Sequence, residues 1–373
     1  MIKREKKDKI SIIIPFQHID DYVHETVSHL LKQEYEDFEI ILLPNKPLCQ
    51  EPQTKVWGGS GVLEHCRESK LLPAKAGRMH ETRGFSKSKN PFGKIVKIFP
   101  TGNIQPAEKR NIGAGKARGN ILSFIDDDAY PVDKYWLSRA AEYFKSSGST
   151  GAVGGPNLTP PKDGTFQTVC GEVLASNLFS GPASIRYKRG KAGPYHDLPS
   201  CNLFVDKKTY NEVNGFYPHF WPGEDTKLCA DILRLGKRIF YDPDIAVYHH
   251  RRKGWEGYVR QTFRFGLHRG YFMKIFPYTS LRPIFFIPTI FVIWLLFGPW
   301  LGLVHQFFLY FYLATLIIYG VLVVTASTSS KHFLTIPLFI IIGFATHVAY
   351  GIGVIVGLIK PVKQSQLKPK HER

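Results

Sequence analysis

Apolar runs and amphipathic segments alternate from the start of the chain. The run at 9–16 is rich in β-branched residues and ends at a proline, which indicates a buried strand, and 38–44 is a second such run. Between them, apolar residues recur at helical spacing within 23–31, behind an aspartate that can cap the helix. A strand, a helix and a strand in this order predict a right-handed parallel crossover and therefore an α/β sheet.

Residues 45–93 interrupt this alternation. Pro, Gly, Lys and Ser are scattered through them, so we interpret them as an irregular insertion, in which Trp57 and two cysteines leave room for a small packed element. The segment 238–250 reads as a strand pair or an extended segment, and 157–200 gives no pattern that we interpret. Elsewhere the alternation resumes, with strands expected at 94–100, 120–125 and 151–157, a strand and then a helix within 200–213, and helices at 105–119, 135–144 and 223–236.

From Ile284 to Ile359 the chain is mostly Phe, Ile, Leu, Val and Tyr, and Lys331 is its only charged residue. Three apolar stretches of this region predict three hydrophobic helices. The first is short and contains a proline, so a re-entrant or interfacial segment is the alternative. The expected organisation is an α/β domain, a basic amphipathic segment, a membrane domain and a basic tail, at 1–250, 251–282, 283–360 and 361–373, with apolar stretches at 283–297, 301–326 and 333–359.

Positive charge is concentrated next to the apolar region. The formal net charge is +18, and 251–282 carries eight Lys or Arg against one acid. Cytoplasmic loops and anionic lipid head groups account for such a cluster, so we expect membrane lipids and no nucleic acid as partners. Aromatics interleaved with Arg and Lys suggest a helix in the head-group region, and a solvated basic helix is the alternative.

The ends of the chain bear on its orientation. The first ten residues are basic and lack the apolar stretch of a signal peptide, so we expect the N-terminal domain to face the cytoplasm. The basic tail favours the same side, which requires an even number of crossings, whereas three full spans place it opposite; its side stays open. Five widely spaced cysteines show no ligand pattern and are interpreted as reduced structural thiols.

Three consecutive carboxylates, Asp126–Asp128, follow the apolar run 121–125. The carboxyl ends of parallel strands are where α/β sheets bind ligands. Clustered carboxylates repel one another, and a divalent cation with bound phosphate oxygens relieves that repulsion. The acidic triplet therefore indicates a cation and phosphate site, although acids also start turns.

Other candidate residues surround this triplet in the sequence. Arg110 lies in a glycine-rich helix that supplies complementary positive charge or plain scaffolding, and neither GxxxxGK[ST] nor GxGxxG is present. Glu224 and Asp225 begin a helix, where they serve either as caps or, for Asp225, as a general base. His249 and His250 end an extended segment and are possible ligands of a metal or a pyrophosphate.

The order SIIIP, RNIGAGKARG, FIDDDAYP, GGPN, WPGEDTKL and PDIAVYHH resembles that of a family 2 glycosyltransferase of the GT-A fold over residues 9–265, apart from the insertion. The resemblance implies a GT-A (Rossmann-like, mostly parallel) catalytic domain followed by an α-helical membrane domain, in a hexosyltransferase. Asp126 and Asp128 match the DxD motif, which holds the nucleotide ribose and, through Mg²⁺ or Mn²⁺, the pyrophosphate. Asp127 is grouped with the nucleotide-sugar residues, mainly as the spacer between them.

The resemblance assigns the remaining site residues as well. Asp225 matches the catalytic base of inverting members. Gln261 and Arg264 match QxxRW on the acceptor and pyrophosphate side. The other assignments are the nucleotide-sugar side for Pro15, Arg110, Asn111 and Glu224, and the metal for His250 together with Asp128.

Two departures from the family pattern limit the transfer. The chain has Pro44, Asn45 and Lys46 where the family usually has a carboxylate that binds the nucleotide base. The identity of the nucleotide base and its contacts therefore stay open. Phe265 replaces the Trp of QxxRW, which favours a single transfer over processive synthesis.

Together these features predict an inverting glycosyltransferase anchored in the cytoplasmic membrane, with its catalytic domain facing the cytoplasm. It would move sugar from a nucleotide-sugar donor to a lipid-linked or envelope glycan acceptor. One alternative is transfer directly onto polyprenyl phosphate, which is already an anion and needs no base. The alternative of another class is a non-catalytic membrane scaffold with a ligand-binding, transferase-like domain.

Overall fold

The computed structural model describes residues 8–47, 95–146, 148–220, 223–328, 330 and 332–362. Most of the predicted insertion at 45–93 and most of the tail lie outside them. The centre of the fold is a sheet of eight strands in the order β3-β2-β1-β4-β9-β6-β10-β8. The strands are β1 Ile10–Pro15, β2 Phe38–Leu43, β3 Ile95–Ile98, β4 Ile121–Ile125, β6 Thr150–Gly154, β8 Gly193–Tyr195, β9 Asn202–Asp206 and β10 Arg238–Tyr241.

The predicted parallel crossovers are confirmed. β1 pairs in parallel with β2 and with β4, β2 pairs in parallel with β3, and β10 pairs in parallel with β6. β9 is antiparallel to both β4 and β6, and the edge strand β8 is antiparallel to β10. The fold is therefore an α/β domain with a mostly parallel sheet.

A second sheet of three short strands lies beside the carboxyl end of β4. Its order is β5-β11-β7, and the segment predicted at 238–250 supplies β10 to the large sheet and β11 to this small one. β11 runs antiparallel to β5 with His249 opposite Ala129. The strands are β5 Ala129–Pro131, β7 Asn157–Leu158 and β11 Val247–His249.

Helices cover both faces of the large sheet because successive strand residues point to opposite sides. Ile12 and Ile14 pack in the cluster that includes α1 and α4, whereas Ile13 packs with residues of α3 and α8. This two-sided burial explains why the strands read as continuous apolar runs. The helices of this part of the chain are α1 Asp21–Leu30, α3 Pro106–Lys116, α4 Trp136–Ser146, α5 Thr165–Ala175, α6 Asn177–Ser180, α7 Lys207–Glu212 and α8 Glu224–Arg234, with 3₁₀ turns η3 Gly181–Arg186 and η4 Pro218–Phe220.

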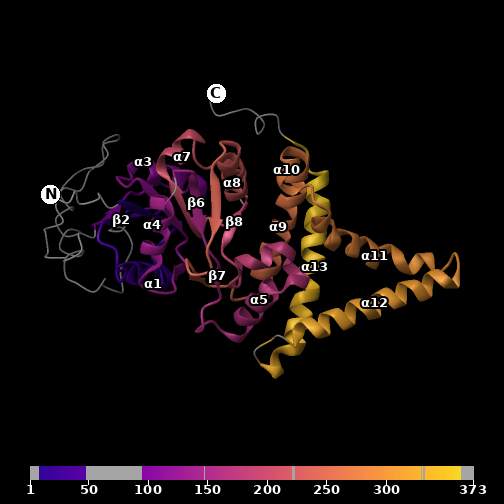
Figure 1. Cartoon of the computed structure of the whole chain (residues 1–373). Helices are drawn as coiled ribbons and strands as arrows, with labels where there is room; N and C mark the ends of the chain where they lie inside the picture. Colours follow the sequence, from indigo (N-terminus) through magenta and orange to yellow (C-terminus); the bar gives the residue numbers. More distant parts are fainter. Residues whose placement is uncertain are drawn as a thin grey trace, which may run out of the picture.

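Three helices are long and apolar enough to cross a membrane, at Pro283–Leu301, Gln306–Ser327 and Phe333–Ile359. The first is longer than predicted because the helix continues through Pro299. α11 and α12 extend away from the α/β domain as a hairpin, whereas α13 lies along α9 (Figure 1). The elements are α9 Trp255–Ile275, α10 Pro277–Ser280, η5 Pro283–Phe286, α11 Ile287–Leu301, α12 Gln306–Ser327, η6 Phe333–Thr335 and α13 Ile336–Ile359.

α9 and α13 approach each other closely at glycines that each helix carries four residues apart. A Cβ added at Gly266 of α9 would overlap the Tyr350 carbonyl oxygen, and one at Gly357 of α13 would overlap that of Leu267. Small residues allow such close backbone contact between helices. The basic segment is thus helical, as expected, and one of its faces is covered by α13.

α13 also contacts the α/β domain. The ring of Phe179 of α6 occupies the space above Gly343, where a Cβ would overlap it. His347 of α13 lies 3.0 Å, through its Nε2, from the Leu178 carbonyl oxygen. The apolar helix α13 therefore packs against both α9 and the α/β domain.

Candidate active site

The acidic triplet lies between β4 and β5, at the predicted sheet edge. Pairing between β5 and β11 brings His249 to it, and the Nε2 atom of His249 lies 3.0 Å from Asp128 Oδ1. One ligand atom each from Asp126, Asp128 and His249 all lie within 4.8 Å of one another. Two carboxylate oxygens and an imidazole nitrogen are a donor set that suits Mn²⁺ and, with more water, Mg²⁺.

The electrostatics of this cluster fit a cation. Burial opposes ionisation of Asp128, but the charges of His249 and Arg252 lower its pKa to about 2. Burial raises the pKa of Asp127 to about 8, with the charges of Asp128 and Asp126 acting in the same direction. Asp128 is therefore the carboxylate held ionised, and a bound cation would take over the role that the His249 proton plays beside it.

The group of possible metal ligands contains His249, and the metal assignment of His250 stays a prediction. Both ring nitrogens of His250 are engaged elsewhere, Nδ1 at 2.5 Å from Asp163 and Nε2 at 2.9 Å from Glu25. β11 ends at His249, and the N–H of His250, the next residue, donates to the Asp128 carbonyl oxygen at 3.0 Å. The register with β5 selects His249, which the sequence left undecided as a ligand.

Arg110 connects the triplet to the start of α8. Its guanidinium donates to Asp126 at 2.6 Å and to Glu224 at 2.8 Å, and it lies over the ring of Phe216. Only 3% of Arg110 is exposed, and its ion pair with Glu224 is shielded from water, whereas the Asp126 side chain is partly exposed. Burial raises the pKa of Glu224 to about 7 although Arg110 opposes this. Arg110 and Glu224 thus lie with the predicted nucleotide-binding acid.

Asn111 supports a turn through its side chain, and its assignment to the nucleotide side stays a prediction. Its Oδ1 accepts from the Tyr210 hydroxyl at 2.6 Å and from the Phe216 N–H at 2.9 Å, and its Nδ2 donates to the Phe216 carbonyl at 2.8 Å. These bonds hold the turn before η4, where Asn214 has φ 59° and Gly215 φ 67°. The side chain supports this turn instead of facing the carboxylates.

Pro15 and Lys109 lie at the same edge of the sheet. Ile13 is opposite Phe124, which places Pro15 at the level of Asp126. The Lys109 ammonium donates to the carbonyl oxygens of Phe16 and Leu43, and to Asn45 Oδ1 at 2.5 Å. Lys109 therefore ties together the carboxyl ends of β1 and β2, a role the sequence did not reveal beyond its positive charge.

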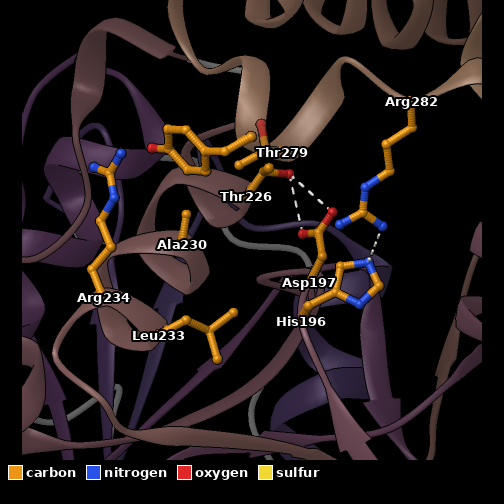
Figure 2. Close-up of a pocket in the computed structure, with 9 residues that line it drawn as sticks. His196, Asp197, Thr226, Ala230, Leu233, Arg234, Thr279 and Arg282 are labelled. Atoms are coloured by element: carbon orange, nitrogen blue, oxygen red, sulfur yellow. Dashed lines mark hydrogen bonds between the residues drawn. The ribbon is translucent and has the colours of Figure 1, made fainter.

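Asp225 lies at the first turn of α8, next to a second ion pair. Arg186 of η3 contacts Asp197 at 2.6 Å, and Thr226 donates to the same carboxylate at 3.1 Å (Figure 2). Burial raises the pKa of Asp225, the charge of Arg186 lowers it and that of Asp197 raises it. Arg186 and Asp197 lie in the segment 157–200, whose sequence shows no pattern that predicts its structure.

Two further predictions concern residues away from this edge. Gln261 and Arg264 lie on α9, where Gln261 is half-buried and Arg264 exposed. Their acceptor-side role stays a prediction. The described cysteines are free and buried, which agrees with structural thiols: Cys170, Cys201 and Cys229.

Comparisons with known proteins place the fold and the family. A mannosyltransferase from Pyrobaculum calidifontis, solved with GDP-mannose and Mn²⁺, matches 95% of this chain and 88% of its own with a TM-score of 0.50 and 14% identity, which supports the GT-A fold. The pre-mycofactocin glycosyltransferase of Mycobacterium tuberculosis is 26% identical over 159 residues, which are 42% of this chain and 33% of that protein. The chain therefore spans about one third of that relative's length.

A second relative is matched along more of its length. The dolichyl N-acetyl-alpha-D-glucosaminyl phosphate 3-beta-D-2,3-diacetamido-2,3-dideoxy-beta-D-glucuronosyltransferase of Methanococcus voltae is 20% identical over 285 residues, 73% of this chain and 78% of the relative. The family model described as "Glycosyltransferase like family 2" matches residues 8–266. That match takes in the sheet, the acidic triplet, Arg110, Asp225 and His249, and it shows that this chain belongs to glycosyltransferase family 2.

Proposed function

We propose that this protein transfers a sugar from a nucleotide-sugar donor to a lipid-linked or envelope glycan acceptor, with inversion at the anomeric carbon. The observation that carries the proposal is the cluster of Asp126, Asp128 and His249 at the ligand edge of the sheet. These residues would hold Mg²⁺ or Mn²⁺, which supplies charge stabilisation for a departing diphosphate. A glycosyltransferase solved with Mn²⁺ and a sugar nucleotide shares the fold.

Asp225 would act as the base of a single displacement. The acceptor hydroxyl oxygen bonds to the anomeric carbon, the bond from that carbon to the diphosphate oxygen breaks, and the hydroxyl proton passes to Asp225. The nucleoside diphosphate leaves as an anion. Because burial raises the pKa of Asp225 above its usual value, its carboxylate is a stronger base than an exposed aspartate.

Arg110 would act on the donor side by fixing the carboxylates. Its bonds to Asp126 and Glu224 couple the donor edge to the helix that carries Asp225. We therefore assign Arg110 a positioning role between the two parts of the site. Asp127 stands between Asp126 and Asp128 in the chain and would serve mainly as a spacer.

The apolar helices would place this site near its acceptor. Three candidate spans follow the catalytic domain, and α13 contacts that domain directly. Anchoring in the membrane raises the effective concentration of an acceptor confined to the same bilayer. The basic segment that precedes the spans favours a catalytic domain on the cytoplasmic side. The acceptor named for the Methanococcus voltae relative, a dolichyl-linked sugar phosphate, supports a lipid-linked acceptor.

The test is a screen of the purified full chain against a panel of nucleotide sugars. Thermal stabilisation that requires Mn²⁺ or Mg²⁺ should identify the donor, and lipid extract should then support transfer. We expect Asp225→Asn to lower turnover by about 10²- to 10⁴-fold while donor binding persists. The matched control is Asp231→Asn, on the same helix and paired with Lys227. Full turnover in Asp225→Asn would favour direct transfer to polyprenyl phosphate, and no stabilisation or turnover with any donor would favour a scaffold.

A further inference from the structure

A pocket of about 230 Å³ lies between α8 and the segment from Tyr278 to Arg282 (Figure 2). Its lining includes Thr226, which follows Asp225 in the chain, and Asp197, to which Thr226 donates. A single bridging water needs only about 10–15 Å³ of such space, so the pocket is much larger than a bridging-water site. The pocket is therefore large enough for a small polar group with an attached chain.

The pocket is lined by positive charge on opposite sides. Arg234 of α8 and Arg282, before the first apolar helix, flank it, and Figure 2 shows them across the pocket from each other. Asp197 is the one carboxylate among its described lining residues. Arg186 pairs with Asp197 at 2.6 Å and balances its charge. The two remaining guanidinium groups therefore give the lining of the pocket a net positive charge.

Both guanidinium groups retain hydrogen-bond donors. Arg282 contacts the Nε2 atom of His196 at 3.2 Å. Arg234 lies over the ring of Tyr278 at 4.0 Å, and its nearest described carboxylate oxygen, on Asp231, is 3.6 Å away. A guanidinium has five N–H donors, so these contacts leave several for a ligand with phosphate oxygens.

The position of the pocket joins the active site to the apolar helices. Thr226 of its lining directly follows Asp225 in the chain, and Arg282 of its lining directly precedes the candidate span Pro283–Leu301. An amphiphile with its anionic head between Arg234 and Arg282 could therefore extend its apolar tail along that span. A water-soluble anion would gain nothing from this second feature.

We propose that this pocket binds the phosphate head group of the polyprenyl-type lipid that carries or forms the acceptor. The proposal rests on the proposed function, because it names the class of acceptor that Asp225 would face. Arg234 and Arg282 contact the phosphate oxygens, because the hydroxyls of Thr226 and Thr279 already donate to Asp197 and to the Phe276 carbonyl. The lipid tail leaves the pocket beside α11.

The probe is farnesyl phosphate, titrated into the full chain in detergent, with farnesol and inorganic phosphate as separate arms. We expect farnesyl phosphate to bind more tightly than either. Arg234→Gln and Arg282→Gln should each weaken its binding by about tenfold, the size expected for one lost charge-assisted hydrogen bond. Arg282→Lys should recover part of the loss because it restores the charge without the planar fork.

Arg260→Gln is the matched control, since Arg260 lies in the same basic region but pairs with Glu256 on the exposed side of α9. It should leave the affinity unchanged. Equal binding of farnesol and farnesyl phosphate, or equal effects of all three Gln variants, would overturn the proposal. Binding of inorganic phosphate as tight as that of farnesyl phosphate would also overturn it, because the pocket would then bind a free anion.

The proposal and the proposed function fail in different ways. Metal-dependent stabilisation by a nucleotide sugar reports on the donor site and should be unchanged in Arg234→Gln and Arg282→Gln, which also shows that these variants are folded. Farnesyl phosphate binding without any donor binding would sustain the pocket and reject the transferase. Donor turnover with an unchanged KM for the lipid acceptor in Arg234→Gln and Arg282→Gln would sustain the transferase and reject the lipid pocket.

Discussion

Arg110 donates to Asp126 at 2.6 Å while its other terminal nitrogen donates to Glu224 at 2.8 Å. Because Arg110 and Glu224 are buried, removing the cation leaves the Glu224 carboxylate without its guanidinium partner away from water, while Asp126 is partly exposed. We expect Arg110→Met to destabilise the protein by about 3–5 kcal/mol. Arg110→Met with Glu224→Gln should recover part of this, since one of the unpaired charges is gone. Thermal unfolding of both variants measures the difference, and a double variant no more stable than the single one would contradict it.

The two adjacent histidines provide a test of the metal site. His249 lies with Asp126 and Asp128, whereas His250 contacts Glu25 and Asp163. We expect His249→Gln to weaken Mn²⁺-dependent donor binding by at least about tenfold, or about 1.4 kcal/mol. His250→Gln should leave metal dependence unchanged even if it lowers thermal stability. Titration of Mn²⁺ at fixed donor concentration distinguishes them, and the reverse ranking would restore His250 as the ligand.

The acidic triplet can be divided in the same way. Asp128 stays ionised beside His249, whereas burial favours the protonated form of Asp127. We therefore expect Asp128→Ala to abolish metal-dependent donor binding and Asp127→Ala to have a mild effect. Equal damage in the two variants, measured by metal-dependent thermal shift, would mean that the spacer assignment is wrong.

The pH profile of turnover should report on Arg186. A base must be ionised, so activity is lost as pH falls through the pKa of Asp225. The charge of Arg186 lowers that pKa, and the loss of Arg186 also leaves Asp197 unneutralised, which raises it. We expect Arg186→Gln to move the acid limb of kcat/KM to higher pH. Arg189→Gln, whose partner Asp244 is exposed, is the control, and coincident acid limbs would remove Arg186 from the mechanism.

Much of the fold could be predicted because its signals are local. Strands such as Ile10–Pro15 are buried on both faces and read as apolar runs, and α1 shows its spacing and its Asp20 cap directly. The strands β5, β7 and β8 have only two or three residues, too few for any periodicity. Their existence depends on partners distant in the sequence.

The same distinction separates the site residues that were found from those that were missed. The acidic triplet, Arg110 and Asp225 lie within short motifs. The choice of His249 over His250 depends on the register between β5 and β11, more than 100 residues apart in the chain. Arg186 and Asp197 meet through irregular backbone, and no spacing rule links them to Asp225.

Glu39 should make the stability of the catalytic domain sensitive to acid. Burial alone would raise its pKa, but hydrogen bonds from Lys97, Ser11 and the Arg118 N–H lower it. Because the pKa of Glu39 is lower in the folded state than its ordinary value of 4.5, the ionised carboxylate stabilises the fold at pH values above 4.5. This stabilisation is lost as the pH falls through the lowered pKa of the folded state. We expect Glu39→Gln to unfold at a lower temperature at pH 7 and to show a flatter decline from pH 5 to pH 3.

Glu34→Gln is the control for that measurement, because the pair of Glu34 with Lys134 is half-exposed on both sides. Exposed ion pairs contribute little to the stability of a protein. The unfolding temperature of Glu34→Gln should equal that of the unchanged protein at every pH. Parallel pH curves for Glu39→Gln and the unchanged protein would show that the buried carboxylate does not contribute to the acid dependence.

The contact between α9 and α13 should tolerate no side chain at its glycines. A Cβ at Gly357 would overlap the Leu267 carbonyl oxygen, which is backbone and cannot rotate away, whereas a Cβ at Gly320 of α12 would meet nothing within 4 Å. We expect Gly357→Ala to lower the unfolding temperature in detergent and to loosen α9. Gly320→Ala should be neutral or stabilising by up to about 1 kcal/mol, because alanine favours the helix. Since α13 also contacts Phe179, loosening it should lower turnover without changing metal affinity. Equal unfolding temperatures for the two variants would mean that the helices can separate without loss.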